Sequence, residues 1–327
     1  MTVASRQAWS GMDLARRAGS YLEEQGVERG VLDAELLLAS VLGINRLDLY
    51  LQFDRPVTPA ELSGFRECVR RRARREPLQY ITGSAAFREF EVPVDRRVFI
   101  PRPETEILAG EVLDWSERRY GPQHPPTASA GGTGAESVDD AGLDLLEIGT
   151  GSGAMAIALA REGPFRRVLG TDISPEAVSV AAANARLCGL EETTDAPVIE
   201  FRCGRSYEPL RPGERFDVIV SNPPYIPSAE IEDLAPEVRD WEPRRALDGG
   251  ADGLRQIREI VSEASGWLAP GGLLALEVGY GQAGAVRDLI ESDPTFAAAR
   301  VCPDLTRRER FVLGRARPAG SFTQQPT

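Results

Sequence analysis

The four residues Asn222-Pro223-Pro224-Tyr225 combine side chains and backbone constraints that could act on an –NH2 group. They follow the apolar run 216–221, which predicts a buried strand, so they lie where a parallel strand ends. The two prolines fix φ and remove two backbone donors. The resulting stiff turn offers carbonyl oxygens, one amide side chain and one aromatic face. Two such oxygens can hold the two hydrogens of a planar –NH2 group while the ring covers its face.

A second group of residues suits a cofactor. Gly149-Thr150-Gly151-Ser152-Gly153 follows the expected strand 143–148 and precedes an expected helix, so backbone N–H groups face any ligand there. Asp172 ends the next expected strand and could accept both hydroxyls of a ribose. Dinucleotide and S-adenosylmethionine sites share these features. A nicotinamide enzyme would need a proton relay, so the lack of a usable histidine favours S-adenosylmethionine.

The single histidine, His124, lies at the edge of a low-complexity stretch. Its position argues against Ser-His-Asp and Cys-His nucleophilic schemes and against most zinc sites, and we expect no metal. The four cysteines form no CxxC pair and are expected to be buried and unpaired.

Charge and hydropathy limit the possible partners. The net charge of −12 argues against tight, nonspecific nucleic-acid binding, which requires a basic surface. No apolar run reaches membrane-spanning length and the N-terminus lacks a signal peptide, so we expect a cytoplasmic protein.

The first part of the chain is expected to be helical. Ser10 and Asp13 can cap a helix that ends near Gln25, a second covers about 32–42, and Thr58 with Pro59 begins a third. The third helix carries an arginine run, which we interpret as a solvated helix face in preference to a patch for RNA or an acidic partner. The arginines are Arg66, Arg70, Arg71, Arg72, Arg74 and Arg75.

Alternating strands and helices after residue 142 predict an α/β fold: a doubly wound, mostly parallel sheet that ends in an antiparallel hairpin. The domains expected are a helical domain at 1–76, a linking β-hairpin at 77–100 and a catalytic domain at 101–317. Within the last, residues 121–142 form a mobile insert, and 318–327 form a disordered tail.

Six segments together closely resemble the HemK/PrmC family of release-factor glutamine N5-methyltransferases, over roughly residues 10–315. They are Gln79–Gly83, Ile100–Glu106, Gly149–Gly153, Asp172–Ser174, Asn222–Ile226 and Glu242-Pro243. The resemblance implies a class I methyltransferase-like fold with seven strands, a helical domain that recognises the substrate, and S-adenosylmethionine as cofactor. It also implies class 1 peptide chain release factors as partners, methylated on the glutamine of their Gly-Gly-Gln loop.

The resemblance also implies residue roles. Asn222, Pro223, Pro224 and Tyr225 would be catalytic and would bind the substrate, together with Arg102 and Pro103. The cofactor would be held by Glu147, Gly149, Thr150, Gly151, Ser152, Gly153, Asp172, Ile173, Ser206 and Asn222. Glu147 stands where the family more often has aspartate, which should preserve an acidic contact. Arg205 stands where the family commonly has an acidic residue near the adenine, so one adenine contact is expected to be missing.

Three other functions remain open at this point. The first is methylation of a ribosomal-protein glutamine, and the second is adenine-N6 methylation of nucleic acid, which would require base flipping and phosphate contacts. The third, suggested by Arg205, is a non-catalytic cofactor-binding protein.

Overall fold

The computed structural model describes residues 10–120, 142–190 and 198–319. The chain divides into two compact units. The smaller unit contains the residues up to Ser84 together with Leu234–Trp241, and the larger contains Ala85–Asp233 and the residues from Glu242 onward. The expectations for His124, for the insert up to residue 141 and for the tail after residue 319 lie outside the described residues.

The smaller unit is helical, as the cap residues predict. Its helices are α1 (Gly11–Glu24), α2 (Gly30–Leu42), α3 (Arg46–Leu51), α4 (Pro59–Ala73), α5 (Leu78–Thr82) and α9 (Pro236–Arg239). The Ser10 hydroxyl accepts from the Asp13 N–H at 3.2 Å to begin α1. Thr58 and Glu61 form a reciprocal capping box at the start of α4. The left-handed Gly43 ends α2.

The arginine run is only partly solvated: Arg66, Arg70 and Arg74 are exposed as predicted, but the predicted solvated face is wrong for Arg72. Arg72 is buried and donates through Nε to Asp33 at 2.7 Å. A second nitrogen of Arg72 donates to Glu237 at 2.9 Å, although Glu237 lies 165 residues further along the chain. Arg75 also binds Glu237 through two bonds of 2.7 Å. These pairs attach the segment Leu234–Trp241 to the helical unit.

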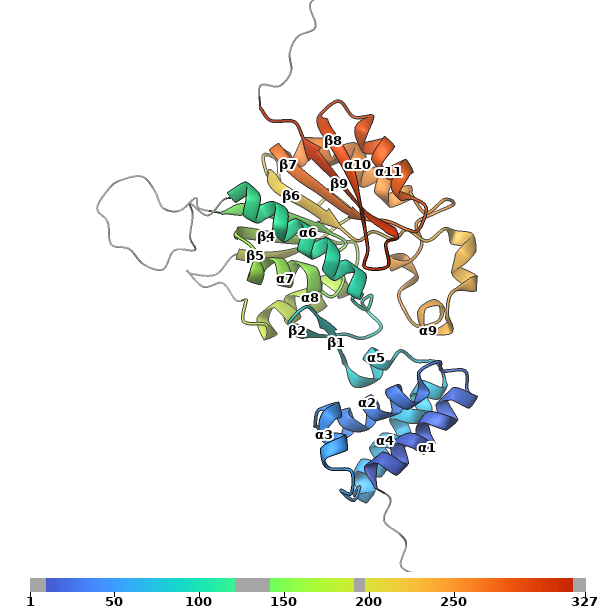
Figure 1. Cartoon of the computed structure of the whole chain (residues 1–327). Helices are drawn as coiled ribbons and strands as arrows, with labels where there is room; N and C mark the ends of the chain where they lie inside the picture. The colour runs from blue at the N-terminus through green and yellow to red at the C-terminus, as the bar shows by residue number, and fades with distance from the viewer. Residues whose placement is uncertain (1–9, 121–141, 191–197, 320–327) are drawn as a thin grey trace, which may run out of the picture. The chain divides into compact units, whose positions relative to one another are not determined.

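The larger unit is a doubly wound α/β domain, which confirms the predicted fold class. A small hairpin, β1 (Ser84–Phe87) and β2 (Phe90–Pro93), precedes it. Its strands are β3 (Leu143–Ile148), β4 (Phe165–Asp172), β5 (Val198–Cys203), β6 (Phe216–Ser221), β7 (Leu268–Glu277), β8 (Phe296–Pro303) and β9 (Glu309–Ala316). They form one seven-stranded sheet in the order β5-β4-β3-β6-β7-β9-β8, where β9 runs antiparallel to both of its neighbours (Figure 1).

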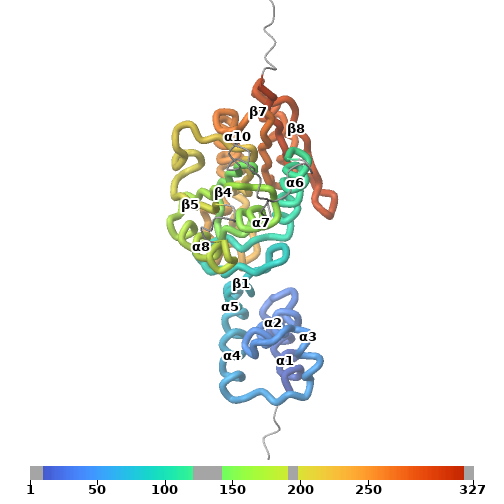
Figure 2. Tube along the Cα trace, turned by 90° about the vertical axis from the view of Figure 1, so that its left-hand side faces the viewer, coloured from blue at the N-terminus to red at the C-terminus, as the bar shows by residue number. Residues whose placement is uncertain are grey.

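Helices cover both faces of the sheet. The helices of the larger unit are α6 (Pro103–Tyr120), α7 (Ala154–Glu162), α8 (Pro175–Leu187), α10 (Arg255–Trp267) and α11 (Ala283–Glu291). Figure 2 shows α6 and α10 on opposite sides of the strands. The central strands are therefore buried on both sides: Leu145, Leu146, Val218, Ile219 and Leu274 are wholly inaccessible to solvent. This is why these strands read as continuous apolar runs.

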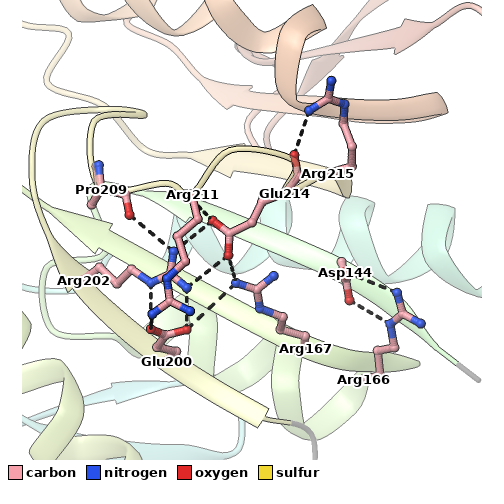
Figure 3. A network of polar contacts seen from close by, with 9 residues as sticks. All are labelled: Asp144, Arg166, Arg167, Glu200, Arg202, Pro209, Arg211, Glu214 and Arg215. Atoms are coloured by element: carbon pink, nitrogen blue, oxygen red, sulfur yellow. Dashed lines mark hydrogen bonds and ion pairs between the residues drawn. The ribbon is translucent and has the colours of Figure 1, made fainter. Parts of the chain in front are cut away.

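Ion pairs tie the edge strand β5 to β4 and to the turn before β6. Figure 3 shows Arg202 between Glu200, at 2.7 Å, and Glu214, at 2.9 Å. Arg167 of β4 also contacts Glu214. Partial burial opposes ionisation of Glu214, but hydrogen bonds from Arg202, the Arg211 N–H and Arg167 lower its pKa to about 2. The network holds the sheet edge and does not line the cavity described below.

Two further expectations have structural outcomes. All four cysteines are free, as predicted, but only Cys302 is buried. Cys68 and Cys188 are half-buried and Cys203 is exposed at the end of β5, so the expectation of burial is wrong for these three. Among the described residues, no helix is both long enough and apolar enough to cross a bilayer.

Candidate active site

The two motifs meet because their strands are neighbours. β3 and β6 pair in parallel, with Ile148 beside Ser221 at their carboxyl ends. The Ser221 hydroxyl donates to the Ile148 carbonyl at 2.6 Å, which ties the two strand ends together. The glycine loop and the Asn-Pro-Pro-Tyr turn therefore leave the sheet side by side at one edge, where open α/β sheets bind ligands.

The glycine loop requires its glycines. Gly149, Gly151 and Gly153 have φ of 77°, 55° and 80°, a region that side-chain-bearing residues rarely adopt. At Gly153 an added Cβ would also lie 3.0 Å from the Ala181 Cβ in α8. The loop is anchored to β4 because the N–H groups of Gly149 and Thr150 donate to the Thr171 carbonyl at 2.8 and 2.9 Å.

Asp172 lies at the end of β4, facing this loop. One carboxylate oxygen accepts from the Gly151 N–H at 2.9 Å and the other from the Ser174 N–H at 2.8 Å. Burial raises the pKa of Asp172, and these two backbone donors oppose that rise. Each oxygen has a second lone pair, so the carboxylate can still accept a hydroxyl hydrogen.

A cavity of about 360 Å³ joins the two motifs within the larger unit. Most of the predicted site residues line it: Glu147, Gly149, Thr150, Gly151, Ser152, Asp172, Ile173, Ser206, Asn222, Pro224 and Tyr225. Gly153, Pro223, Arg102 and Pro103 are not among the lining residues. The expectation that the loop's N–H groups face a ligand is wrong for Gly149, Thr150, Gly151 and Gly153, whose N–H groups donate within the protein. The cavity offers a carboxylate for hydroxyls and an apolar wall that includes Phe99 and Met155. These features fit a nucleoside-bearing cofactor such as S-adenosylmethionine.

Two charged residues singled out in the sequence are neutralised by partners. The Arg102 guanidinium pairs with the buried Glu242 and lies 4.6 Å from the centre of the Phe99 ring. Arg205 lines the cavity and binds Glu259, with its Nε 2.8 Å from one carboxylate oxygen. Glu259 also lines the cavity. An acidic group is thus present beside Arg205, although it comes from α10.

Glu147 is 2% exposed at the end of β3, and the Thr150 hydroxyl donates to it at 2.5 Å. Desolvation raises the pKa of Glu147 to about 8, although the hydrogen bond from Thr150 opposes the rise. Burying this carboxyl group therefore favours its protonated form.

We expect Glu147→Gln to remove a pH dependence of stability. Between pH 4.5 and 8 the unfolded chain has lost the Glu147 proton while the folded chain keeps it, so the free energy of unfolding falls as pH rises. The fall should total about 4 kcal/mol by pH 8, from 1.4 kcal/mol per pKa unit. Urea unfolding of both proteins from pH 5 to 8 measures it. Across this range the free energy of unfolding of the variant should rise steadily relative to that of the wild type. The same pH dependence in both proteins would contradict the raised pKa of Glu147.

Three residues that the sequence analysis did not assign to the site contact the Asn-Pro-Pro-Tyr turn. The Asn222 Nδ2 donates to the Thr105 hydroxyl at 2.9 Å, and that hydroxyl donates to the buried Glu277 at 2.8 Å. Arg310 donates to the Tyr225 hydroxyl at 2.8 Å. Burial, followed by the charge of Glu277, raises the pKa of Tyr225 to about 12. The sequence carried one signal for this group, a lone carboxylate within the apolar run of β7.

Comparison with known proteins agrees with this geometry. The PrmC N-terminal domain family matches residues 13–83, and a methyltransferase domain family matches residues 145–241. A release factor glutamine methyltransferase of Geobacter sulfurreducens is 43% identical over 90% of this chain and 93% of its own length. Relatives of the same name from Moorella thermoacetica and Caulobacter vibrioides are 40% and 34% identical, over 88% and 98% of this chain and 92% and 99% of their own lengths. The chain therefore belongs to the release factor glutamine methyltransferase family.

Proposed function

We propose that this protein methylates the side-chain amide nitrogen, N5, of the glutamine in the Gly-Gly-Gln motif of class 1 peptide chain release factors. The observation that carries the proposal is the orientation of Asn222. Its –NH2 group is held by Thr105, so its carbonyl oxygen points away from Thr105 in a cavity shared with the glycine loop. An oxygen acceptor at this place suits an incoming amide hydrogen.

The cofactor is S-adenosylmethionine, which supplies an electrophilic methyl group. The loop Gly149–Ser152 would line its site and let it approach the backbone closely, and Asp172 would accept hydrogen bonds from its ribose hydroxyls. Ile173 and Ser206 border the same space. Among the described residues no group of acidic, histidine and cysteine side chains is arranged to hold a metal ion.

An amide nitrogen is a weak nucleophile because its lone pair is delocalised into the carbonyl. The Asn222 carbonyl oxygen and the Pro223 carbonyl each accept one amide hydrogen, which raises the electron density on nitrogen and aims its lone pair at the methyl group. Orientation of this kind is worth roughly 7–11 kcal/mol relative to reactants free in solution. Fixed carbonyl dipoles also stabilise the positive charge that develops on nitrogen. As the bond from nitrogen to the methyl group forms, the bond from that group to the sulfonium would break and leave its electron pair on sulfur as a neutral thioether. The excess proton would leave to water, and Tyr225 would cover the amide plane.

In this proposal the helical unit binds the part of the release factor outside the Gly-Gly-Gln motif. The match of residues 13–83 to the PrmC N-terminal domain supports it. Leu47 and Leu51 on α3 and the adjacent Phe53 are also 74%, 78% and 63% exposed, an apolar surface of the kind that partners bind. An intact factor should therefore be a much better substrate than a short Gly-Gly-Gln peptide.

The test is to incubate the full-length protein with methyl-labelled S-adenosylmethionine and one acceptor at a time. The acceptors are an intact release factor, the same factor with the motif glutamine changed to alanine, a Gly-Gly-Gln peptide, ribosomal protein and DNA. We expect label only in the intact factor and, weakly, in the peptide, with mass spectrometry placing it on the glutamine side chain. Equal reaction of peptide and factor would remove the recognition role of the helical unit.

The other candidate functions are outcomes of the same experiment. Label in ribosomal protein alone would redirect the activity to that substrate. Label in DNA alone would overturn the proposal, although the net charge of −12 speaks against such a substrate. Cofactor binding without transfer to any acceptor would indicate a non-catalytic protein.

A further inference from the structure

The carboxyl group of Glu277 is buried directly behind the Asn-Pro-Pro-Tyr turn. Burial raises its pKa, and the Thr105 hydroxyl, the charge of Arg310 and the Tyr225 hydroxyl oppose that rise. Glu277 ends β7 and is inaccessible to solvent, as are its chain neighbours Leu276 and Val278. Transfer of an ionised carboxylate into such surroundings is unfavourable unless donors and a counter-charge compensate. A hydrophobic residue would continue the core here, so the carboxylate is not explained by packing.

Three donors from three different elements converge on Glu277. The Thr105 hydroxyl, from the first turn of α6, is 2.8 Å from one carboxylate oxygen. The Tyr225 hydroxyl and a guanidinium nitrogen of Arg310 are each 3.3 Å from the other oxygen. Arg310 also donates to the Tyr225 hydroxyl at 2.8 Å, and its guanidinium carbon lies 4.9 Å from the centre of the Tyr225 ring. Glu277 thus binds the hydroxyl at the edge of the Tyr225 ring, and Arg310 contacts both that hydroxyl and the face of the ring.

The direction of the hydrogen bonds determines how the Asn222 amide faces. A carboxylate accepts hydrogen bonds and donates none, so the single hydrogen of the Thr105 hydroxyl points to Glu277. The Thr105 oxygen can then only accept, and it accepts from the –NH2 group of Asn222 at 2.9 Å. A flipped Asn222 would bring its carbonyl oxygen against the lone pairs of Thr105. It would also offer –NH2 hydrogens to a substrate amide that itself needs acceptors.

We propose that Thr105 and Glu277 are positioning residues for the methyl transfer: they hold the Asn222 side chain with its carbonyl oxygen toward the substrate amide. Glu277, with Arg310, holds Tyr225 over that amide. This inference rests on the function proposed above. It also explains the threonine that follows Pro103-Glu104 at the start of α6. That residue is 6% exposed, and its hydroxyl bonds Glu277 and Asn222, both outside its own helix.

The chain contains only three asparagines, Asn45, Asn184 and Asn222. The hydrogen-bond relay from Asn222 through Thr105 to Glu277 can therefore be observed without measuring activity. Protein labelled with ¹⁵N-asparagine should give three side-chain amide pairs by NMR, and the pair missing from Asn222→Ala is assigned to Asn222. In the wild type one Asn222 Nδ2 hydrogen should exchange slowly with solvent. In Thr105→Val we expect that exchange to accelerate at least about tenfold, because the hydrogen loses its acceptor. Thr105→Ser, which keeps the hydroxyl, should restore the slow rate.

Kinetics of the same variants test the consequence. Thr105→Val should lower kcat about 10- to 100-fold, the range expected when a reacting group is misplaced, with little change in the Kd for S-adenosylmethionine. Thr105→Ser should recover most of the loss. Glu277→Gln should lower kcat at least as much, because its –NH2 group can donate to Thr105 and reverse the relay. Thr295→Val removes another hydroxyl-to-carboxylate bond, 2.6 Å to Asp293, and should leave kcat unchanged.

The outcomes separate this inference from the proposed function. Unchanged Asn222 amide exchange in Thr105→Val, or wild-type kcat in both Thr105→Val and Glu277→Gln, would overturn the relay. A wild-type protein that fails to methylate release factors but shows the slow Asn222 hydrogen would overturn the proposed substrate and leave the relay standing.

Discussion

Replacing Asn222 with alanine should lower turnover on release factor by about 100- to 1,000-fold while leaving cofactor affinity within a few-fold of wild type. The loss corresponds to removing one preorganised dipole from an active site, which costs about 3–4 kcal/mol. The Asn222 side chain donates to the Thr105 hydroxyl and not to the glycine loop, so the cofactor contacts should persist. Single-turnover kinetics and calorimetric titration with S-adenosylmethionine measure the two effects separately.

Asn184 provides the matched control, because it is the other asparagine of the larger unit. Its Nδ2 donates to the carbonyls of Ser152, at 2.8 Å, and Pro93, at 3.0 Å, so it holds the cofactor loop rather than the substrate turn. Asn184→Ala should raise the Kd for S-adenosylmethionine and leave the single-turnover rate at saturating cofactor nearly unchanged. A wild-type rate in Asn222→Ala would remove the asparagine from the mechanism.

The sequence predicted those parts of the fold that depend on local patterns. The apolar runs of β3 and β6 are buried on both faces, so they read as strands from composition alone. The position of Asn222 followed from the end of β6, and that of the glycine loop from the end of β3. The parallel pairing of β3 with β6 then brings the two motifs together.

The contacts that sequence analysis missed join residues far apart in the chain. Thr105 lies 172 residues from Glu277, and Arg72 lies 165 residues from Glu237. No periodicity records such a pairing. Arg72 belongs to a dense arginine run at a helix end, where solvent exposure is the usual outcome. Its pairs with Asp33 and Glu237 and its hydrogen bond to the Glu76 carbonyl make its burial tolerable. The one local signal of such contacts was a charged residue inside an apolar segment, as Glu277 is in β7.

Gly253→Ala should impair catalysis strongly although the residue lies outside the Asn-Pro-Pro-Tyr motif. Gly253 has φ of 77°, and a Cβ there would lie 2.2 Å from the Tyr225 carbonyl oxygen and 2.4 Å from Gln282 Nε2. Gln282 donates to that same carbonyl at 2.9 Å, so the added methyl group must displace the backbone of Tyr225 or break this bond. We expect a loss of at least about 3 kcal/mol in stability, from backbone strain and steric overlap, and about 100-fold in kcat. Urea unfolding and single-turnover kinetics measure these effects.

Gly271→Ala separates the two causes, because Gly271 has the same φ of 77° but no atom within 4 Å of an added Cβ. The stability of that variant should fall only by the cost of left-handed geometry for alanine, roughly 1–2 kcal/mol, and its kcat should equal that of the wild type. If both variants lost stability equally and both kept full activity, the loop at Gly253 would not support Tyr225. If Gly253→Ala alone lost kcat while S-adenosylmethionine still bound, the active geometry would depend on the backbone position of Tyr225 as well as on its side chain. The carbonyl of Tyr225 would then be part of what keeps the turn rigid, since it accepts the hydrogen bond from the Gln282 side chain.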